Sequence, residues 1–346
     1  MKALLIASAL TLVGSCATSS YQQKIENLEE TIVFEQPEVV INYSNTITAD
    51  ELSSHVYTLA SPEFEGRETG HDGFEKASEY LKEFYIKNGI PSPLGGDNYY
   101  QHIPKSYFTQ DSPASQNVVA FIEGVEHPEE VIILSAHLDH LGTTDDTIYY
   151  GADDNASGTA ALMEIAEAFM TAKNNGHGPK RSILFLHLTA EEAGLLGSNY
   201  YVKHPLYTLN NTVVNLNIDM IGRVDPKYIA QQDENYIYII GADRLSTELH
   251  YISEAANVWF VNLKLDYTFN DDDDSHRYYY RSDHYNFASR GIPVIFYFNG
   301  EHEDYHQPTD TPDKINYPLL KKRTQLIFAT AWYLANSKNR LKVNTH

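Results

Sequence analysis

The sequence predicts an α/β protein in which a largely parallel, mixed sheet is covered by helices on both faces. Apolar segments of strand length alternate with amphipathic segments of helical period along most of the chain. The apolar segments are nearly continuous, which is typical of parallel strands buried on both faces. The chain has 346 residues, of which 42% are hydrophobic. We expect a single folded domain over residues 48–346.

The individual elements follow from local patterns. Six apolar segments predict strands: Val118–Ile122, Val131–Ala136, Ser182–Leu188, Val213–Ile218, Tyr236–Ile240 and Val294–Phe298. Two apolar stripes of helical period predict helices over Ser157–Ala172 and Tyr317–Ala335. Thr48 and Glu51 have the spacing of a capping box, and we place the start of the domain there.

The first residues predict export. Lys2 is followed by an apolar run over residues 3–13, which is too short to span a bilayer and is typical of a signal peptide. Residues 13–16 resemble a bacterial lipobox, so we expect residues 1–15 to be removed and Cys16 to carry a lipid. Residues 16–47 are expected to form an acidic tether, with a short strand around residues 39–41. This predicts a lipoprotein anchored to the membrane, periplasmic or at the cell surface; the alternative is a secreted protein.

The charge balance excludes one class of partner. Acidic residues outnumber basic ones by 47 to 25, which gives a formal charge of −22. Such a surface repels phosphate backbones, so we expect no nucleic acid partner. The acidic run Asp271–Asp274 predicts a solvated loop rather than a calcium site. Because Cys16 is the only cysteine, no internal disulfide and no cysteine metal ligand is expected.

Three of the expected strands end in side chains that bind metals. They are His137 and Asp139 after the strand at 131–136, Glu191 and Glu192 after that at 182–188, and Asp219 after that at 213–218. The carboxyl ends of parallel strands meet at one edge, where open α/β sheets place their sites. Histidines and carboxylates without cysteine favour a catalytic zinc site, and two close ions need a bridging carboxylate. The sequence therefore predicts a metal site at this edge.

These segments resemble the motifs of a known family. The matching motifs are His137-x-Asp139, Gly151-Ala152-x-Asp154-Asn155-x-Ser157-Gly158, Glu191-Glu192, Asn217-x-Asp219, Tyr305-His306-x-x-x-Asp310-Thr311, Phe64-x-Gly66-Arg67-x-x-Gly70 and Ser282-Asp283-His284. Their order from about Leu59 to Ile315 resembles that of the co-catalytic zinc exopeptidases, metallopeptidase family twenty-eight. This family includes secreted bacterial aminopeptidases, glutamate carboxypeptidases and, as relatives, glutaminyl cyclases. The resemblance implies a zinc-exopeptidase fold, without an inserted protease-associated domain because the intervals are too short.

The resemblance also implies a role for each site residue. Two zinc ions per chain are expected, the first held by His137 and Asp219 and the second by Glu192 and His306. Asp154 would bridge them. Asp139 would orient His137, and Glu191 would be the general base. A carboxylate that accepts the far N–H of a ligand histidine fixes its tautomer, which agrees with the role implied for Asp139.

A competing motif also includes His306. Residues 302–306 fit H-E-x-x-H, the thermolysin-type zinc signature, which works only on a helix. Gly300 before it and Pro308 after it leave too short a window for a stable helix. We therefore expect His306 to be a ligand on a loop, with His302 beside the site or at the surface.

The resemblance implies an enzyme that hydrolyses N-terminal peptide bonds with a metal-bound water. The substrate pocket is expected to include Tyr280, Arg281 and His284. Three alternatives remain open. A carboxypeptidase of the same fold would need a cation for the substrate carboxylate, for which Arg281 is a candidate. A glutaminyl cyclase would bind a single zinc, and a catalytically inactive binding module would lack activity altogether.

Overall fold

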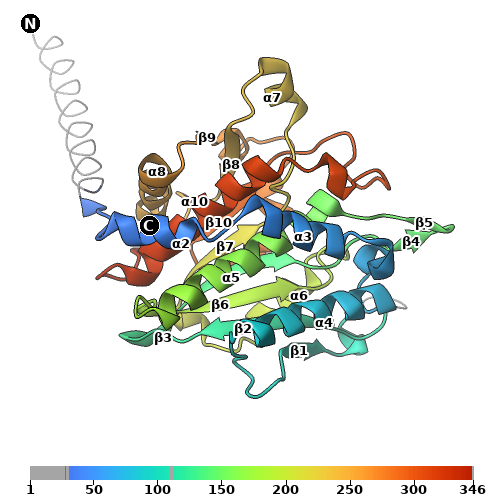
Figure 1. Ribbon diagram of the computed structural model, residues 1–346, viewed down its shortest axis with the longest axis horizontal. Coiled ribbons are helices and arrows are strands. Elements are labelled where there is room, and N and C mark those ends of the chain that lie inside the picture. Colours follow the sequence, from blue (N-terminus) through green and yellow to red (C-terminus); the bar gives the residue numbers. More distant parts are fainter. Residues whose placement is uncertain (1–27, 29–30, 109–111, 345–346) are drawn as a thin grey trace, which may run out of the picture.

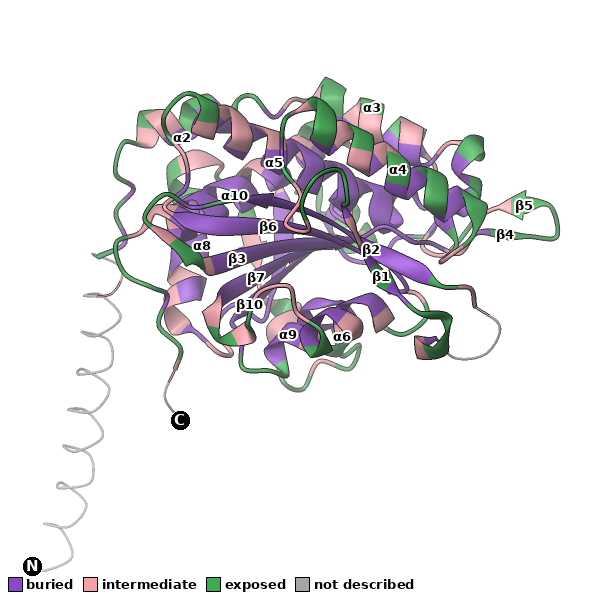
Figure 2. Ribbon diagram, turned by 90° about the horizontal axis from the view of Figure 1, so that it is seen from below, coloured by how far each residue is buried: buried purple, intermediate pink, exposed green. Residues whose placement is uncertain are grey.

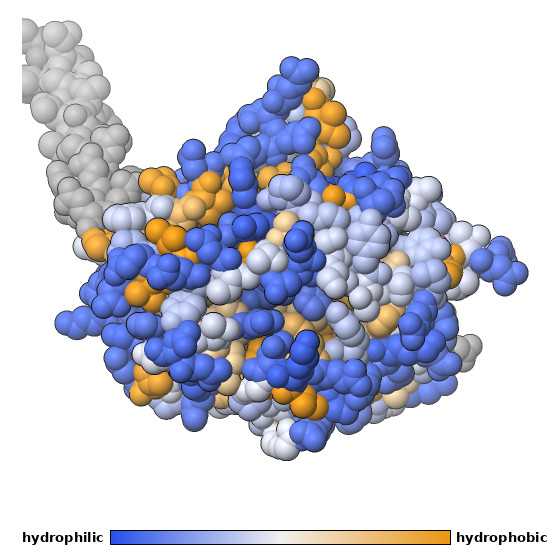
Figure 3. All heavy atoms as spheres, in the orientation of Figure 1, coloured by the Kyte–Doolittle hydropathy of each residue, from blue (hydrophilic) through white to orange (hydrophobic). Residues whose placement is uncertain are grey.

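The computed structural model describes Leu28 and residues 31–108 and 112–344. The expected signal peptide, Cys16 and part of the expected tether lie outside the described residues. Within the described part of the chain, no helix has the length and apolar character needed to cross a membrane. The face shown in Figure 3 is mostly hydrophilic, in agreement with the high content of charged residues.

An eight-stranded mixed sheet forms the centre of the molecule (Figure 1). Its order is β1-β2-β6-β3-β7-β10-β8-β9. The strands are β1 (Tyr100–Ile103), β2 (Ser115–Ile122), β3 (His127–His137), β6 (Arg181–Leu188), β7 (Thr212–Ile218), β8 (Tyr236–Ile240), β9 (Lys264–Asp266) and β10 (Val294–Phe298). The four central strands β6, β3, β7 and β10 are parallel to one another. Their carboxyl ends therefore meet at one edge. A separate hairpin consists of β4 (Thr143–Thr144) and β5 (Thr147–Ile148).

Helices cover both faces of the sheet (Figure 2). One face carries α2 (Pro37–Ser44), α3 (Ala49–Leu59), α4 (Asp72–Lys87), α5 (Gly158–Asn174), α8 (Thr247–Phe260) and α10 (Tyr317–Asn336). The other face carries α6 (Leu196–Lys203) and α9 (His284–Ala288), and α7 (Pro226–Gln231) lies on an excursion that projects from the body. The fold is a single α/β domain, as the sequence predicts. Between Arg67 and β2, the described residues hold only α4, β1, the short 3-10 helix Lys105–Tyr107 and connecting turns.

The structure confirms the capping box and corrects the start of the domain. The Thr48 hydroxyl accepts the Glu51 backbone N–H at 3.1 Å and donates to the Glu51 carboxylate at 2.6 Å. Residues 39–41 belong to the helix α2 and not to the expected strand, because Pro37 is well suited to the first turn of a helix. Val40 is fully buried and Phe34 is 4% exposed. The expected tether therefore does not extend to residue 47, since the packed part of the chain begins near residue 32.

A row of polar side chains crosses the buried centre of the sheet and ends at the site. The side-chain amide of Asn215 donates to the Ser135 hydroxyl at 2.8 Å, and that hydroxyl donates to the side-chain oxygen Oδ1 of Asn217 at 2.7 Å. The Asn217 amide donates to the Ser282 hydroxyl at 2.8 Å, which donates to Asp219 Oδ2 at 2.6 Å. We call these five residues the polar row. Each of the five side chains makes at least one hydrogen bond within the row, which offsets part of the cost of its burial, although the side-chain oxygen of Asn215 has no partner among the described residues.

Candidate metal centre

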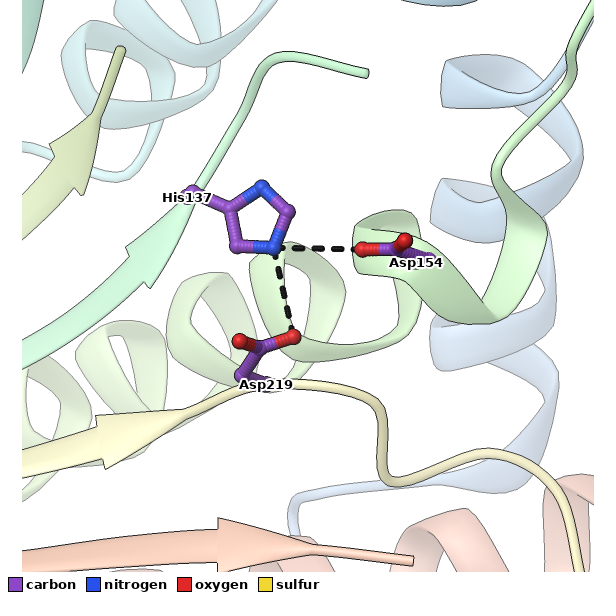
Figure 4. A group of neighbouring side chains, drawn as sticks. All are labelled: His137, Asp154 and Asp219. Atoms are coloured by element: carbon purple, nitrogen blue, oxygen red, sulfur yellow. Dashed lines mark hydrogen bonds and ion pairs between the residues drawn. The ribbon is translucent and has the colours of Figure 1, made fainter. Parts of the chain in front are cut away.

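The ends of adjacent parallel strands bring the first cluster of side chains together. His137 is the last residue of β3, and Asp219 follows β7 directly. Figure 4 shows the His137 ring in contact with the carboxylates of both Asp219 and Asp154, the latter from the turn before α5. His137 Nε2 lies 3.2 Å from Asp154 Oδ1 and 3.2 Å from Asp219 Oδ1. His137 is 1% exposed and Asp219 7% exposed, so the cluster is shielded from solvent.

The turn that carries Asp154 is held from two sides. The Asp310 carboxylate accepts the backbone N–H groups of Asp153 and Asp154 at 3.0–3.1 Å. The Asn155 side chain donates to the carbonyl of Ile218 at 2.9 Å, which fastens the turn to the end of β7. A Cβ at Gly158 would lie 2.3 Å from Asn155 Oδ1, so this close approach requires glycine. The turn is therefore fixed with the Asp154 carboxylate directed at His137.

A second cluster lies on the other oxygen of Asp154. His306 Nε2 lies 3.2 Å from Asp154 Oδ2 and 3.2 Å from Glu192 Oε2. Asp154 thus presents Oδ1 to the first cluster and Oδ2 to the second, as a bridging carboxylate must. Residues 302–306 form turns rather than a helix, so the competing H-E-x-x-H interpretation does not apply. His302 instead contacts the carboxylate of Asp153 at 3.1 Å.

Asp139 contacts His137 differently from the expectation. His137 Nδ1 lies 3.1 Å from the backbone carbonyl oxygen of Asp139, whereas the nearest carboxylate oxygen is 3.9 Å away. The Asp139 carboxylate accepts the backbone N–H groups of Glu191 and Glu192 at 3.1 and 3.4 Å and the Thr69 hydroxyl at 3.0 Å. Asp139 therefore fixes the His137 ring through its backbone and the Glu191-Glu192 loop through its side chain.

The geometry of the first cluster suits a bound cation. A carbonyl oxygen only accepts, so His137 Nδ1 carries the ring hydrogen and a neutral ring presents its lone pair at Nε2. That lone pair faces two carboxylate oxygens, which is unfavourable unless the ring is protonated or a cation lies between them. Burial disfavours the protonated ring, but the Asp219 and Glu191 carboxylates outweigh burial and raise the pKa of His137 well above 6.5. Ligand atoms of a tetrahedral zinc ion lie about 3.3 Å apart, close to the 3.2 Å seen here.

Glu191 lies beside both clusters and contacts neither imidazole directly in the described structure. Its side chain lines a cavity together with His137, Asp154 and Asp219. Burial raises the pKa of Glu191 well above 4.5, and the carboxylates of Asp219 and Glu192 add to this effect, against the opposing influence of His137. A carboxylate of raised basicity beside a metal cluster is suited to accept a proton.

The same cavity includes side chains outside the predicted ligand set. These are Met220, Tyr278, Arg281, Phe296, Phe298, Glu301 and Tyr305. Arg281 pairs with Glu301 at 3.0 Å, and both side chains are more than a third exposed. Arg281 therefore lies in the same cavity as His137, Asp154 and Asp219, and its role in substrate binding stays a prediction. Tyr280 and His284 do not line this cavity, because Tyr280 faces solvent at 40% exposure and His284 is fully buried behind Phe296.

His140 is the site residue that sequence reasoning missed. It is 1% exposed, and its Nδ1 lies 2.8 Å from Glu192 Oε1. His140, Asp154 and Glu192 offer ligand atoms that all lie within 4.8 Å of one another, as do His137, Asp154 and Asp219. Its position one residue after Asp139, in the loop that follows the same strand, was the signal that could have indicated it. Asp271–Asp274 form no such ligand group within the described residues.

Comparison with known proteins identifies a family. The model of Peptidase family M28 matches residues 117–331. Leupeptin-inactivating enzyme 1 of Streptomyces exfoliatus is 26% identical over 302 residues, which are 81% of this chain and 60% of that protein. Aminopeptidase YwaD of Bacillus subtilis is 26% identical over 241 residues, 66% of this chain and 46% of that protein. The chain thus spans about half the length of the curated relatives it matches.

Solved structures share the fold. The LapA aminopeptidase of Legionella pneumophila superposes with a TM-score of 0.69 at 20% identity, over 89% of this chain and 76% of that one. A zinc aminopeptidase from Bacillus subtilis gives a TM-score of 0.63 at 17% identity, over 85% of this chain and 97% of that one. These similarities establish the α/β architecture around the clusters described above.

Proposed function

The chain belongs to peptidase family M28, and from this premise we propose that it is a two-zinc aminopeptidase that hydrolyses N-terminal peptide bonds. The observation that carries the proposal is the Asp154 carboxylate, whose two oxygens each lie 3.2 Å from a different imidazole. One carboxylate shared between two ligand clusters is what a pair of close cations needs. His137 and Asp219 would hold one zinc, and Glu192 and His306 the other.

The residues of the chain have separable roles in this reaction. When bound, the two zinc ions would lower the pKa of a water molecule and polarise the scissile carbonyl. The Glu191 carboxylate would accept the proton of the attacking water and pass it to the departing amine. Asp139 holds the backbone of Glu191 in place through the hydrogen bond at 3.1 Å. Ser282, by its hydrogen bond to Asp219 Oδ2, leaves Oδ1 free to face His137.

The carboxylate oxygens of the cavity suit a substrate with a free amine. Four carboxylates line it, those of Asp154, Glu191, Asp219 and Glu301, against the single guanidinium of Arg281. Two zinc ions would offset all of this negative charge, so a substrate ammonium group would be bound by hydrogen bonds to individual carboxylate oxygens rather than by the net charge of the cavity. Arg281 is already paired with Glu301, which weakens its attraction for a substrate carboxylate.

A carboxypeptidase is the second candidate, because Arg281 lies in the same cavity as the metal clusters. The test compares aminoacyl p-nitroanilides with their N-acetylated forms and with N-blocked peptides that end in a free carboxylate. An aminopeptidase hydrolyses only the first group, loses activity in a chelator and regains it with two zinc ions per chain. Hydrolysis of N-blocked peptides that is lost in Arg281→Ala would instead identify a carboxypeptidase.

Two further outcomes would overturn the proposal. Cyclisation of N-terminal glutamine, with one zinc bound per chain, would identify a glutaminyl cyclase. Absence of all turnover in fully zinc-loaded protein, across a wide panel of aminoacyl substrates and peptides, would indicate a binding module.

We also propose that Cys16 anchors the protein to a membrane after export.

A further inference from the structure

His140 is a buried histidine to which the proposed mechanism gives no role. Its Nδ1 lies 2.8 Å from Glu192 Oε1 and 3.6 Å from Asp154 Oδ2. Its ring lies edge-on to that of His306, with centroids 6.0 Å apart. His140 therefore contacts the second cluster from the protein side, whereas His306, whose side chain is 35% exposed, approaches from the solvent side.

The orientation of the His140 ring is set by the backbone around it. A Cβ at Gly151 would lie 2.5 Å from the ring, so this segment packs tightly against it. The backbone N–H of His140 donates to the carbonyl of Arg67 at 3.1 Å, and the Arg67 guanidinium donates to the carbonyl of Gly151 at 2.8 Å. The ring is thus clamped before any ligand binds.

The hydrogen on the ring can be assigned from its partner. A carboxylate only accepts, so at 2.8 Å the His140 Nδ1 must be the donor to Glu192 Oε1. His140 Nε2 has no hydrogen-bond partner among the described residues. With Oε1 engaged by His140, the other oxygen of Glu192 is the one that faces His306, at 3.2 Å.

We propose that His140 is a positioning residue for the second metal. It donates one hydrogen bond to Glu192 Oε1 and thereby directs Oε2 into the second cluster. This inference rests on the proposed two-zinc function. Hydrogen bonds to ligating carboxylates fix their orientation, and their removal typically weakens metal binding by about 10- to 100-fold.

Four variants test the inference by zinc titration of metal-free protein against a chromophoric chelator. His140→Ala and His140→Leu remove the donor, and Leu also fills the space. His140→Asn restores a donor, because an Asn side-chain nitrogen can lie close to the position of His Nδ1. His55→Ala is the matched control, since His55 and Glu164 form a partly buried pair at 3.2 Å on α3 and α5, outside the clusters.

We expect the Ala and Leu variants to bind the first zinc as the wild type does and the second about 10- to 100-fold more weakly. His140→Asn should recover most of the second-site affinity, and His55→Ala should change neither site. A general structural defect would instead weaken both sites and would not be rescued by Asn. The inference fails if the wild type binds two zinc ions and the folded Ala and Leu variants bind both with the same affinities. It also fails if His140→Asn binds the second zinc as weakly as His140→Ala does. Wild-type protein that binds fewer than two ions would refute the proposed function itself.

Discussion

His284 should lower the free energy of unfolding in mild acid relative to neutral pH, and His284→Phe should remove this contribution to the pH dependence. The residue lies at the start of α9, fully buried, with its ring stacked on Phe296 at 4.8 Å between centroids. Burial lowers the pKa of His284 from 6.5 to about 3. The folded protein therefore holds the ring neutral at pH values where the unfolded chain protonates it. Phenylalanine keeps an aromatic ring between Phe296 and Tyr279 and cannot titrate.

The size of the effect follows from the two pKa values. Each pKa unit corresponds to about 1.4 kcal/mol, and only the unfolded chain takes up the proton between pH 6.5 and about 3. Above pH 6.5 both states are neutral, so His284 adds no pH dependence there. At pH 5 the free energy of unfolding should be lower by about 2 kcal/mol than at pH 8, from this residue alone. The full loss, ~5 kcal/mol, is reached below the folded-state pKa.

Urea denaturation of metal-free protein at pH 8 and pH 5 measures this contribution. The quantity compared is the change in unfolding free energy between the two pH values, so any packing cost of the new ring cancels within each variant. That change should be smaller by about 2 kcal/mol in His284→Phe than in the wild type. His102→Phe, at an exposed position on β1, controls for the loss of a histidine in general. If His284→Phe shows the same pH response as the wild type, the ring is not held neutral by burial.

Four further predictions concern the site and the leader. Glu191→Gln should keep both zinc ions and lose about 10²- to 10⁴-fold in kcat, because the amide cannot accept the proton; near-wild-type turnover would exclude Glu191 as the base. Asp154→Ala should weaken both zinc sites in metal analysis, and retention of two tightly bound ions would contradict its bridging role. Ser282→Ala should weaken the first site by about 10- to 100-fold and spare the second, the reverse of the His140 variants. Cys16→Ser should release active enzyme into the soluble fraction with kcat unchanged, and a mature N-terminus other than Cys16 in the wild type would refute the anchor.

Much of the sheet was predictable because buried strands have a strong apolar signature. The bounds of β8 and β10 agree with the prediction, and the cores of β2, β3, β6 and β7 do too. The antiparallel direction of β2 was not predictable, since all of its residues are buried and it has the same composition as a parallel strand. The short strands β1 and β9 carry too few residues for a periodic pattern.

Some of the site residues were likewise predictable from the sequence and others were not. Residues at strand ends, such as His137 and Asp219, were predictable because parallel topology brings strand ends together. His284 was expected in the pocket together with Tyr280 and Arg281, but α9 begins at His284 and its side chain is buried in the core. His140 was missed because its role depends on the distance to Glu192, which only the pairing of β3 with β6 determines.

The polar row has a consequence for how the chain reaches its native state. Ser135 and Asn217 are paired in the register of β3 and β7, and they exchange a hydrogen bond at 2.7 Å. A slip of one residue between these strands would turn polar groups toward the apolar layers and leave them without partners. Such a misaligned chain would also carry Asp219 past His137. The hydrogen bonds that disfavour the wrong alignment thus lie in line with the proposed metal ligands, so the pairing that completes the core also places His137 beside Asp219.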